Sequence, residues 1–355
     1  MRRIKLRLAV LLVGTAMNCL GTSNCLQADD VVADTQLESD ADAQPSQPEF
    51  NITMKTLGGR QLWGDVHFFH GWRIQQNVLD GHFRLLDEDD VRHAWGSHEA
   101  CHECLQQIRR DQGLKPMSGK AVILVHGIIR SSKSFDPMKE QLRSSGYQVF
   151  GFDYPSTRVD IPTSADYLKR CMASLEGIDE INFVVHSMGG LVVRASLEEG
   201  HDPRIRRMVM LGVPNRGARM ANLLQKNFFY RTLYGPAGQQ LIEDAEGYIA
   251  RLPTPAFDFA LISGARGTEN GYNPLVPGDD DGTVSLESTR LPGACDFMTV
   301  PILHSVLMWD EAVISSTDRF LRTGALRESG MTEPVPSSGA KTNVTTSSFS
   351  QTVTP

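Results

Sequence analysis

The sequence lacks an excess of basic residues. Its 355 residues carry a net charge of −7, which becomes −11 once the four basic residues of the first 28 positions, the only charges there, are set aside. A body this acidic has no general electrostatic attraction for nucleic acid or for anionic lipid headgroups. We therefore expect no nucleic-acid partner, and no feature of the sequence predicts a protein partner.

Cysteine is scarce as well. Beyond position 28 the chain has only Cys101, Cys104, Cys171 and Cys295, whereas 41% of all residues are hydrophobic. A chain of this length and composition can bury a full core, so disulfides are not required for folding. Four cysteines allow three pairings, and the sequence does not choose among them.

Acidic residues are absent from the N-terminal segment. Residues 1–7 are cationic, an apolar run covers 8–20, and small and polar residues continue to Ala28. The run is too short to span a bilayer comfortably, and its flanks are typical of a secretory signal peptide. We expect residues 1–28 to be removed and the protein to be exported, either periplasmic or secreted. A lipoprotein or an uncleaved N-terminal anchor is the alternative, although asparagine, not a small residue, precedes both cysteines of this segment.

Composition divides the rest of the chain into three parts. Residues 29–49 are acidic and rich in alanine, glutamine and proline, which predicts a disordered linker. Residues 327–355 are rich in serine and threonine, which predicts a disordered tail. The sequence has no internal repeat, so we expect residues 50–326 to form one domain.

Short apolar runs alternate with helical patterns within this domain. Strands are predicted at 121–125, 147–152, 181–185, 207–211, 257–263 and 297–300. Helix-spaced apolar residues predict helices at 163–175, 188–199 and 306–321. Continuous apolar strands alternating with helices indicate an α/β fold, with a mostly parallel central sheet and helices on both faces. The chemistry of such folds lies at the carboxyl ends of the strands.

The strand at 181–185 leads directly into a tight turn, His186-Ser187-Met188-Gly189-Gly190. This strand–turn–helix context is that of a nucleophile elbow, in which small residues let the helix pack close to the strand. The serine then lies at a helix N-terminus, where backbone N–H groups stabilise developing negative charge. We predict that Ser187 is the nucleophile; the alternative is a structural serine that caps the helix. The usual pattern is G-x-S-x-G, and Val185 stands at the first glycine.

A second element, His126-Gly127-Ile128, follows the strand at 121–125. Acyl transfer needs two N–H donors directed at the oxyanion, one after the nucleophile and one from such an earlier loop. The backbone N–H groups of Met188 and Ile128 are the predicted donors. We interpret His126 as a residue that braces the loop rather than as the catalytic base.

Residues 118–322 resemble secreted bacterial lipases and esterases of the α/β-hydrolase superfamily. The resemblance rests on motifs that occur in the right order: VILVHGI, VVHSMGG, LGVPNRG at 211–217, DGTV at 281–284, and His304-Ser305. It implies an α/β-hydrolase fold and a serine hydrolase whose catalytic residues follow the order Ser, Asp, His.

The resemblance also selects the acid and the base. In similar lipases the catalytic aspartate precedes a glycine or small residue and an apolar pair, which fits Asp281 in DGTV, with Asp280 as the fallback. His304 is the only histidine after Asp281 and is the predicted base. Asp279 and Asp280 are then expected to form a solvated turn, with Ca²⁺ binding as the alternative.

A long connection, residues 213–256, follows the strand at 207–211. Its apolar residues, beside the catalytic edge, predict either an acyl-binding cap or a helical excursion packed on the body. A cap would bring Phe228, Phe229 and Leu233 to the substrate. It would also favour medium or long acyl chains over acetyl and allow transient contact with a lipid interface.

Residues 50–117 form an N-terminal extension outside the catalytic core. We expect a hairpin at 62–86, with its turn at Asp80-Gly81, to extend the sheet and a helix to follow. Four side chains have a spacing that allows a zinc site or a C-x-x-C disulfide: His98, Cys101, His102 and Cys104. The predicted chemistry needs neither, so we expect no cofactor and no catalytic metal.

These features together predict a serine hydrolase that cleaves carboxylic esters, a lipase or carboxylesterase, through an acyl-enzyme intermediate. Its substrate would be a small-molecule or lipid ester. The same triad would also serve an acyltransferase, an amidase or a thioesterase. A non-catalytic surface binding protein is a further alternative, which the complete set of triad residues disfavours.

Overall fold

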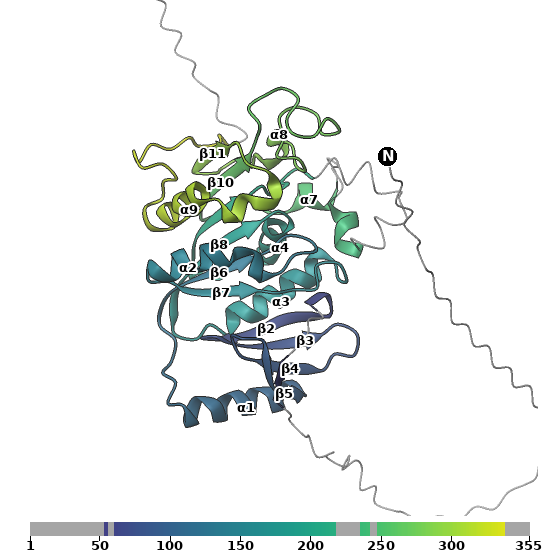
Figure 1. Cartoon of the computed structure of the whole chain (residues 1–355), viewed down its shortest axis with the longest axis vertical. Helices are drawn as coiled ribbons and strands as arrows, with labels where there is room; N and C mark the ends of the chain where they lie inside the picture. Colours follow the sequence, from purple (N-terminus) through teal and green to yellow (C-terminus); the bar gives the residue numbers. More distant parts are fainter. Residues whose placement is uncertain (1–52, 56–59, 218–234, 242–246, 338–355) are drawn as a thin grey trace, which may run out of the picture. The chain divides into compact units, whose positions relative to one another are not determined.

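The computed structural model describes residues 53–55, 60–217, 235–241 and 247–337 (Figure 1). The chain divides into two units, Met1–Gln47 and Pro48–Pro355, and all described residues belong to the second. The predicted signal peptide, the linker and the apolar residues Phe228, Phe229 and Leu233 lie outside the described residues. Within the described ranges, no helix combines the length and the apolar character needed to cross a membrane.

Six parallel strands form the central sheet, in the order β11-β10-β9-β8-β6-β7. They are β6 (Gly119–Val125), β7 (Gln148–Phe152), β8 (Ile178–His186), β9 (Ile205–Leu211), β10 (Asp258–Gly264) and β11 (Asp296–Val300). Each coincides with a predicted apolar run, so the α/β fold with a parallel central sheet is confirmed. The chain order reverses between β6 and β8, and ligands of such folds bind at this switch point.

Alternate side chains of one strand enter two separate cores. In β6, Ala121, Ile123 and Val125 belong to one core, and Val122 and Leu124 belong to the other. Successive side chains of a strand point to opposite faces, so a strand that is apolar at every position must be covered on both sides. The continuous apolar runs of the sequence therefore reflect a doubly covered sheet.

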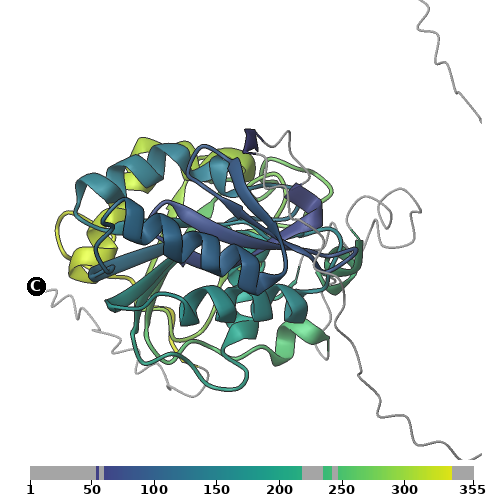
Figure 2. The same ribbon diagram turned by 90° about the horizontal axis from the view of Figure 1, so that it is seen from below.

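Helices cover both faces of this sheet, as predicted (Figures 1 and 2). One core includes buried side chains of α3 (Ile161–Ala173) and α4 (Met188–Ser196). The other includes those of α2 (Asp136–Ser144) and α9 (Glu311–Thr323). The shorter helices are η1 (Arg60–Leu62), η2 (Ser132–Phe135), α7 (Tyr248–Arg251) and α8 (Leu286–Thr289).

The N-terminal extension forms a sheet of its own. Its antiparallel strands have the order β1-β5-β4-β3-β2 and are β1 (Met54–Lys55), β2 (Trp63–Phe69), β3 (Trp72–Asn77), β4 (Phe83–Leu86) and β5 (Val91–Gly96). The expectation that the hairpin extends the main sheet is therefore wrong. Short turns let consecutive antiparallel strands pair with one another, which satisfies their backbone groups without the parallel sheet. The predicted helix follows as α1 (His98–Asp111) and packs on β4 and β5 (Figure 2).

The five-stranded sheet is joined to the rest of the domain through β2, which packs on α3. A Cβ atom at Gly64 would lie 2.9 Å from the Tyr167 ring, so glycine permits this close approach. Two hydrogen bonds link β2 to the end of β7. The Asp65 N–H donates to the Asp153 carbonyl (2.9 Å), and the Asp153 N–H donates to the Asp65 carboxylate (2.6 Å).

The C-terminal region departs from the sequence expectation in two places. The helix predicted at 306–321 is interrupted at Asp310, between the 3₁₀-helix η3 (His304–Trp309) and α9. The Asp310 carboxylate accepts from two N–H groups of the first turn of α9, so it starts a new helix as an N-cap. Residues assigned to the tail are held to the domain through Arg327, which binds the buried Asp296, and through Val335.

Candidate active site

Ser187 stands in a tight turn between β8 and α4. Its backbone has φ of 54° and ψ of −128°, a left-handed conformation that costs a side-chain-bearing residue about 1–3 kcal/mol. The side chain makes no capping hydrogen bond to α4, whereas an ordinary N-cap serine adopts the extended region and makes one. The Ser187 N–H donates to the carbonyl of Leu211, the last residue of β9, at 3.0 Å. The turn thus leaves Ser187 partly exposed and in a strained backbone conformation.

The two glycines after the turn are required by packing. A Cβ atom at Gly189 would lie 2.4 Å from the carbonyl oxygen of Val125 in the neighbouring strand, and one at Gly190 would lie 2.5 Å from a methyl group of Val213. Neither position has room for a side chain. Val185, which stands at the usual first glycine, is instead fully buried between Val125 and Met210 of the adjacent strands.

Asp281 and His304 form a buried hydrogen-bonded pair. The distance between His304 Nδ1 and Asp281 Oδ2 is 2.7 Å, and the His304 N–H donates to the Asp281 carbonyl at 2.8 Å. The second carboxylate oxygen of Asp281 accepts from the N–H groups of Thr283 and Val284. A carboxylate only accepts, so Nδ1 of His304 carries the proton and Nε2 has a free lone pair. This is the tautomer that a general base requires.

Gly212 brings this pair to the turn of Ser187. It follows Leu211, whose carbonyl binds the Ser187 N–H, and its φ of 57° suits glycine. A Cβ atom at Gly212 would lie 3.0 Å from His304 Nδ1 and 3.2 Å from Asp281 Oδ2. All three predicted triad residues therefore gather around the end of β9, at the carboxyl edge of the sheet.

His186 is a residue of this edge that the sequence reasoning passed over. It is fully buried, its ring centroid lies 4.6 Å from that of His304, and its Nε2 donates to the His304 carbonyl at 3.0 Å. Burial, together with the neighbouring His304 and Arg130, lowers the pKa of His186 well below its ordinary value, so the ring is neutral. Its place immediately before Ser187 was the available signal, because the end of β8 faces the loop that carries His304.

The neighbouring aspartates have other partners. Asp280 is buried, and its carboxylate accepts from the N–H groups of Asn273 and Gly282. Asp279 accepts from the N–H groups of Arg266 and Gly267. Both carboxylates brace the loop that carries Asp281. Among the residues that the structure describes, no group of three or more histidine, cysteine, aspartate or glutamate side chains could hold a metal ion.

The loop after β6 contains Ile128, one of the two predicted oxyanion donors. Since β6 and β8 are neighbours, Ile128 and Met188 follow adjacent strands at the switch point of the sheet. The next residue, Ile129, has φ of 64°, and its N–H donates to Ser156 Oγ at 3.0 Å. Arg130 donates to the carbonyl of Ser305 at 3.0 Å, which ties this loop to the one that carries His304.

His126 belongs to this loop, and its contacts are those of a structural residue rather than of a base. Its ring stacks on Tyr154 with 4.4 Å between centroids, and its Nδ1 lies 2.8 Å from the carbonyl of Gly127. The Tyr154 hydroxyl donates to the His126 carbonyl at 2.6 Å. These contacts fix the backbone on either side of Gly127.

A buried charge network connects the loop to the N-terminal sheet. Asp153 lies 3.6 Å from His126 Nε2 and 3.4 Å from a guanidinium nitrogen of Arg73 in β3. Burial, reinforced by the charge of Asp153, raises the pKa of Asp65 to about 7 against the attraction of Arg73. Burial also disfavours ionised Asp153, but Arg73 and His126 outweigh it and lower the Asp153 pKa. Asp153 therefore carries the negative charge while Asp65 holds a proton below about pH 7.

The cysteines of the described region form no disulfide. Cys101 and Cys171 are buried in the apolar core, and burial raises the pKa of Cys171 well above its ordinary value. Cys104, one helical turn after Cys101, is partly exposed. Neither the zinc site nor the C-x-x-C disulfide that the spacing allows is present in this part of the chain.

Comparison with known protein families gives a match over part of the chain. Residues 85–232 match a family described as a domain of unknown function, DUF7379. No curated protein matches the chain.

Solved structures with an α/β-hydrolase-like fold resemble it. A lipase from Bacillus licheniformis in its mature form has 19% identity over 53% of this chain and 86% of its own, with a TM-score of 0.39. A thermophilic esterase from Thermogutta terrifontis has 15% identity over 58% and 90%, with a TM-score of 0.40. Lipase B from Aspergillus fumigatus has 13% identity over 61% and 54%, with a TM-score of 0.42. These likenesses concern the fold alone.

Proposed function

We propose that this protein is a serine hydrolase that cleaves carboxylic esters, a lipase or carboxylesterase, with Ser187, His304 and Asp281 as its catalytic residues. The observation that carries the proposal is the strained, uncapped backbone of Ser187 at the same sheet edge as the buried Asp281–His304 hydrogen bond. Such strain persists only where the surroundings enforce it, and it gathers at functional sites. A serine that merely capped α4 would need none.

The proposed mechanism follows from the proton positions. His304, protonated on Nδ1 and held there by Asp281, takes the Ser187 proton on Nε2 as the serine oxygen attacks the acyl carbon. The N–H groups of Ile128 and Met188 are the proposed donors to the oxyanion that forms. His304 then gives this proton to the alcohol oxygen as the ester bond breaks, and the acyl group stays on Ser187 as an acyl-enzyme. Water, deprotonated by the same imidazole, releases the acid and restores the serine.

Exposed apolar side chains beside the site support an apolar acyl group. Ile129 follows the proposed oxyanion donor and Leu303 precedes His304, and both side chains are exposed, as is that of Leu275. Exposed apolar side chains next to catalytic residues in the chain favour an apolar substrate or a lipid surface. We extend the proposal to esters of medium or long acyl chains, with Phe228, Phe229 and Leu233 as further contacts and transient binding at a lipid interface.

The proposal is tested by covalent labelling of the nucleophile. A fluorophosphonate probe should label the wild-type protein and not Ser187→Ala. The matched control is Ser196→Ala, in the same helix, whose buried hydroxyl donates only to the Val193 carbonyl; it should label normally. Folded wild-type protein that resists the probe would contradict the proposal and favour a binding protein.

Substrate class is tested with p-nitrophenyl esters from acetyl to dodecanoyl, alongside amide and thioester analogues. We expect kcat/KM to rise from acetyl to the medium chains and the amides to react poorly. Faster consumption of ester on addition of an alcohol acceptor, without release of acid, would indicate an acyltransferase.

We also propose that the protein is exported and that residues 1–28 are removed. Expression with residues 1–28 present should give a mature protein outside the cytoplasm that begins at Asp29, as measured by intact mass. A mature mass that includes residues 1–28, or one increased by a lipid, would replace cleavage with one of the anchored alternatives.

A further inference from the structure

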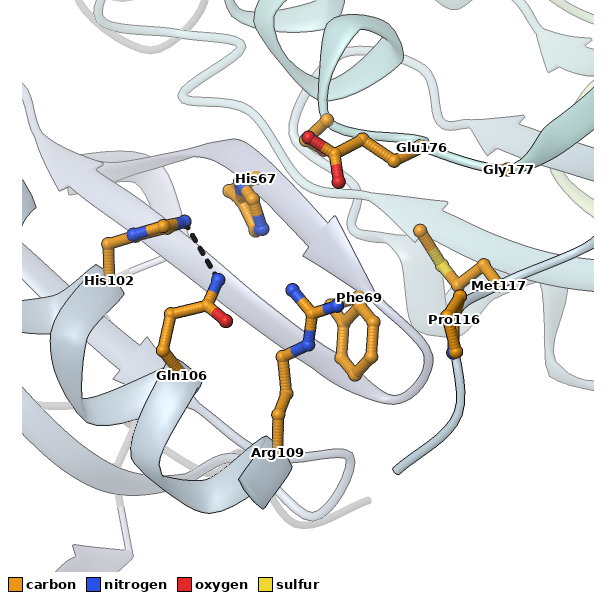
Figure 3. Close-up of a pocket in the computed structure, with 10 residues that line it drawn as sticks. His67, Phe69, His102, Gln106, Arg109, Pro116, Met117, Glu176 and Gly177 are labelled. Atoms are coloured by element: carbon orange, nitrogen blue, oxygen red, sulfur yellow. Dashed lines mark hydrogen bonds between the residues drawn. The ribbon is translucent and has the colours of Figure 1, made fainter. Parts of the chain in front are cut away.

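A polar pocket lies at the amino ends of the parallel strands, opposite the end that carries the proposed active site. It is a cavity of about 170 Å³ between β2, α1 and the segments that precede β6 and β8 (Figure 3). Its lining residues include Glu176 and Gly177, which stand directly before the first residue of β8, whereas Ser187 follows the last. A strand of this length spans about 30 Å. The pocket is therefore separate from the proposed active site.

Arg109 supplies the strongest donor of this pocket. Its guanidinium stacks over the ring of Phe69, 4.1 Å from the ring centre. Within the described part of the chain it forms no side-chain hydrogen bond and no ion pair, although it is partly buried in the fold. Stacking fixes the plane of a guanidinium while leaving its N–H edge available, and that edge matches a carboxylate or phosphate in a bidentate manner.

Three further polar side chains surround the same space. His67 of β2 lies edge-on to His102 of α1 with 5.5 Å between ring centroids. Gln106, one helical turn beyond His102, donates one amide N–H to His102 Nε2 at 3.2 Å and keeps a second N–H for a ligand. No hydrogen bond to the His67 ring is formed by the described residues. Figure 3 shows the Arg109 guanidinium and the Gln106 amide directed into the pocket from α1, with His67 behind them.

The groups that lower the pKa of His67 are all basic side chains of α1. Burial, followed by His102, His98 and Arg109, lowers the pKa of His67 to about 4. The one acidic lining residue, Glu176, is exposed on the opposite wall and forms no ion pair with any described residue. The unpaired Arg109 guanidinium and the N–H group of the neutral His67 ring are hydrogen-bond donors suited to an anion, and a bound anion would offset the charge of Arg109.

We propose that this pocket binds a small oxyanion, a phosphate or a short organic carboxylate, with Arg109 as its principal donor and Gln106 and His67 as supporting donors. The volume suits a ligand of a few heavy atoms and is below that of ordinary drug-sized sites. Phe69 and Met117, both buried, provide an apolar wall for the carbon skeleton of a carboxylate. The bound anion would join α1 to β2 and so stabilise this helix on the N-terminal sheet.

The affinity test uses isothermal titration of the full-length protein at pH 7 with inorganic phosphate and, separately, malonate, each against chloride at equal ionic strength. We expect one site with a Kd of about 1 mM or tighter for one of the two anions. Arg109→Gln should weaken binding at least about tenfold. Arg110→Gln is the matched control, since Arg110 is exposed on the same helix, binds Gln107 and does not line the pocket.

A second measurement locates the anion. The nuclear magnetic resonance titration of the His67 ring should move to higher pH when the preferred anion is present, and this shift should be absent in Arg109→Gln. The groups that face His67 are His98, His102 and Arg109 from α1 and Glu176 from the opposite wall, so His98 and His102 are followed in the same spectra. Absence of binding, equal weakening by both arginine variants, or a His67 titration insensitive to the anion would overturn the proposal.

Discussion

Polar side chains at the carboxyl ends of the parallel strands have hydrogen-bonding partners, whereas those at the amino ends largely do not. At the carboxyl edge, Asp281 has four hydrogen bonds to its side chain and backbone oxygens, and His304 and His186 are each held by a neighbour. At the amino edge, Arg109 and His67 face a cavity without a hydrogen-bonding partner among the described residues. Groups that must keep one orientation during a reaction are fixed before substrate arrives, whereas groups that recognise an ion can be left for the ion to satisfy.

The comparison also concerns backbone strain. Ser187 and Ile129, both with positive φ, lie at the carboxyl edge, while the pocket-lining residues of the amino edge with side chains have ordinary φ. Strain is maintained by tight packing, here the closeness of Gly189 to Val125. The carboxyl edge is therefore the rigid, preorganised one. Substitutions in it should reduce activity, whereas those in the N-terminal region should alter stability or anion binding.

The largest effect is expected from Asp281→Asn. The amide leaves the shape intact but cannot hold the proton on His304 Nδ1, so ester hydrolysis should fall about 10⁴-fold in kcat with KM little changed. The matched control is Asp280→Asn, which removes the charge and one of the two acceptor oxygens of a buried carboxylate and should cost about 1–3 kcal/mol of stability while kcat stays within about tenfold. Steady-state kinetics and thermal unfolding of both variants decide this. A larger loss of kcat in Asp280→Asn than in Asp281→Asn would indicate that Asp280 is the catalytic acid.

A smaller effect is expected at His186, which holds the His304 backbone. His186→Leu leaves the buried His304 carbonyl without its donor, so kcat should fall about tenfold while KM changes less. His186→Gln keeps an N–H donor of similar reach and should restore most of the rate. The pH profile of kcat/KM distinguishes positioning from mere instability, because a displaced His304 alters the profile. If Leu and Gln behave alike, the hydrogen bond to the carbonyl has no part in positioning.

The smallest effect is expected in the N-terminal sheet and concerns stability. The pKa of Asp65 is raised to about 7 in the folded protein, so folding favours its protonated form. The stability that this proton provides is complete at acid pH and is lost as the pH rises from about 4 through about 7. Asp65→Asn should remove this dependence.

The melting temperature of wild type minus that of Asp65→Asn should therefore be lower at pH 8 than at pH 5, by about 2 °C or more. The exposed Asp89→Asn is the control and should give the same difference at both pH values. An unchanged difference for Asp65→Asn would mean that Asp65 is ionised in the folded protein throughout this range.

The sequence predicted best those features that depend on residues close to one another in the chain. The six parallel strands were predictable because a doubly covered strand is apolar at every position. The turn at Ser187 was predictable because a strand, small residues and a helix follow one another directly. Asp281 could be chosen only by resemblance; in the structure, its partner is His304, while Asp280 binds loop N–H groups.

Features that depend on distant contacts were missed or misassigned. The pairing of the N-terminal hairpin depends on which edge its neighbours occupy, and β2 and β5 supply nearer partners than the parallel sheet. The interruption of the last helix depends on one capping aspartate, Asp310, within a continuous apolar pattern. His186 gained its role only when a loop more than a hundred residues away came to lie against it.

The sequence by itself determined the fold class and the tight turn at Ser187, because apolar periodicity and turn residues act over a few neighbouring positions. Only the tertiary structure decided which aspartate meets His304, how His186 and Asp153 support the loops of the site, and that Arg109 and His67 share a pocket at the other edge. Those relations join residues that are brought together by packing, and packing of distant segments leaves no local pattern in the chain.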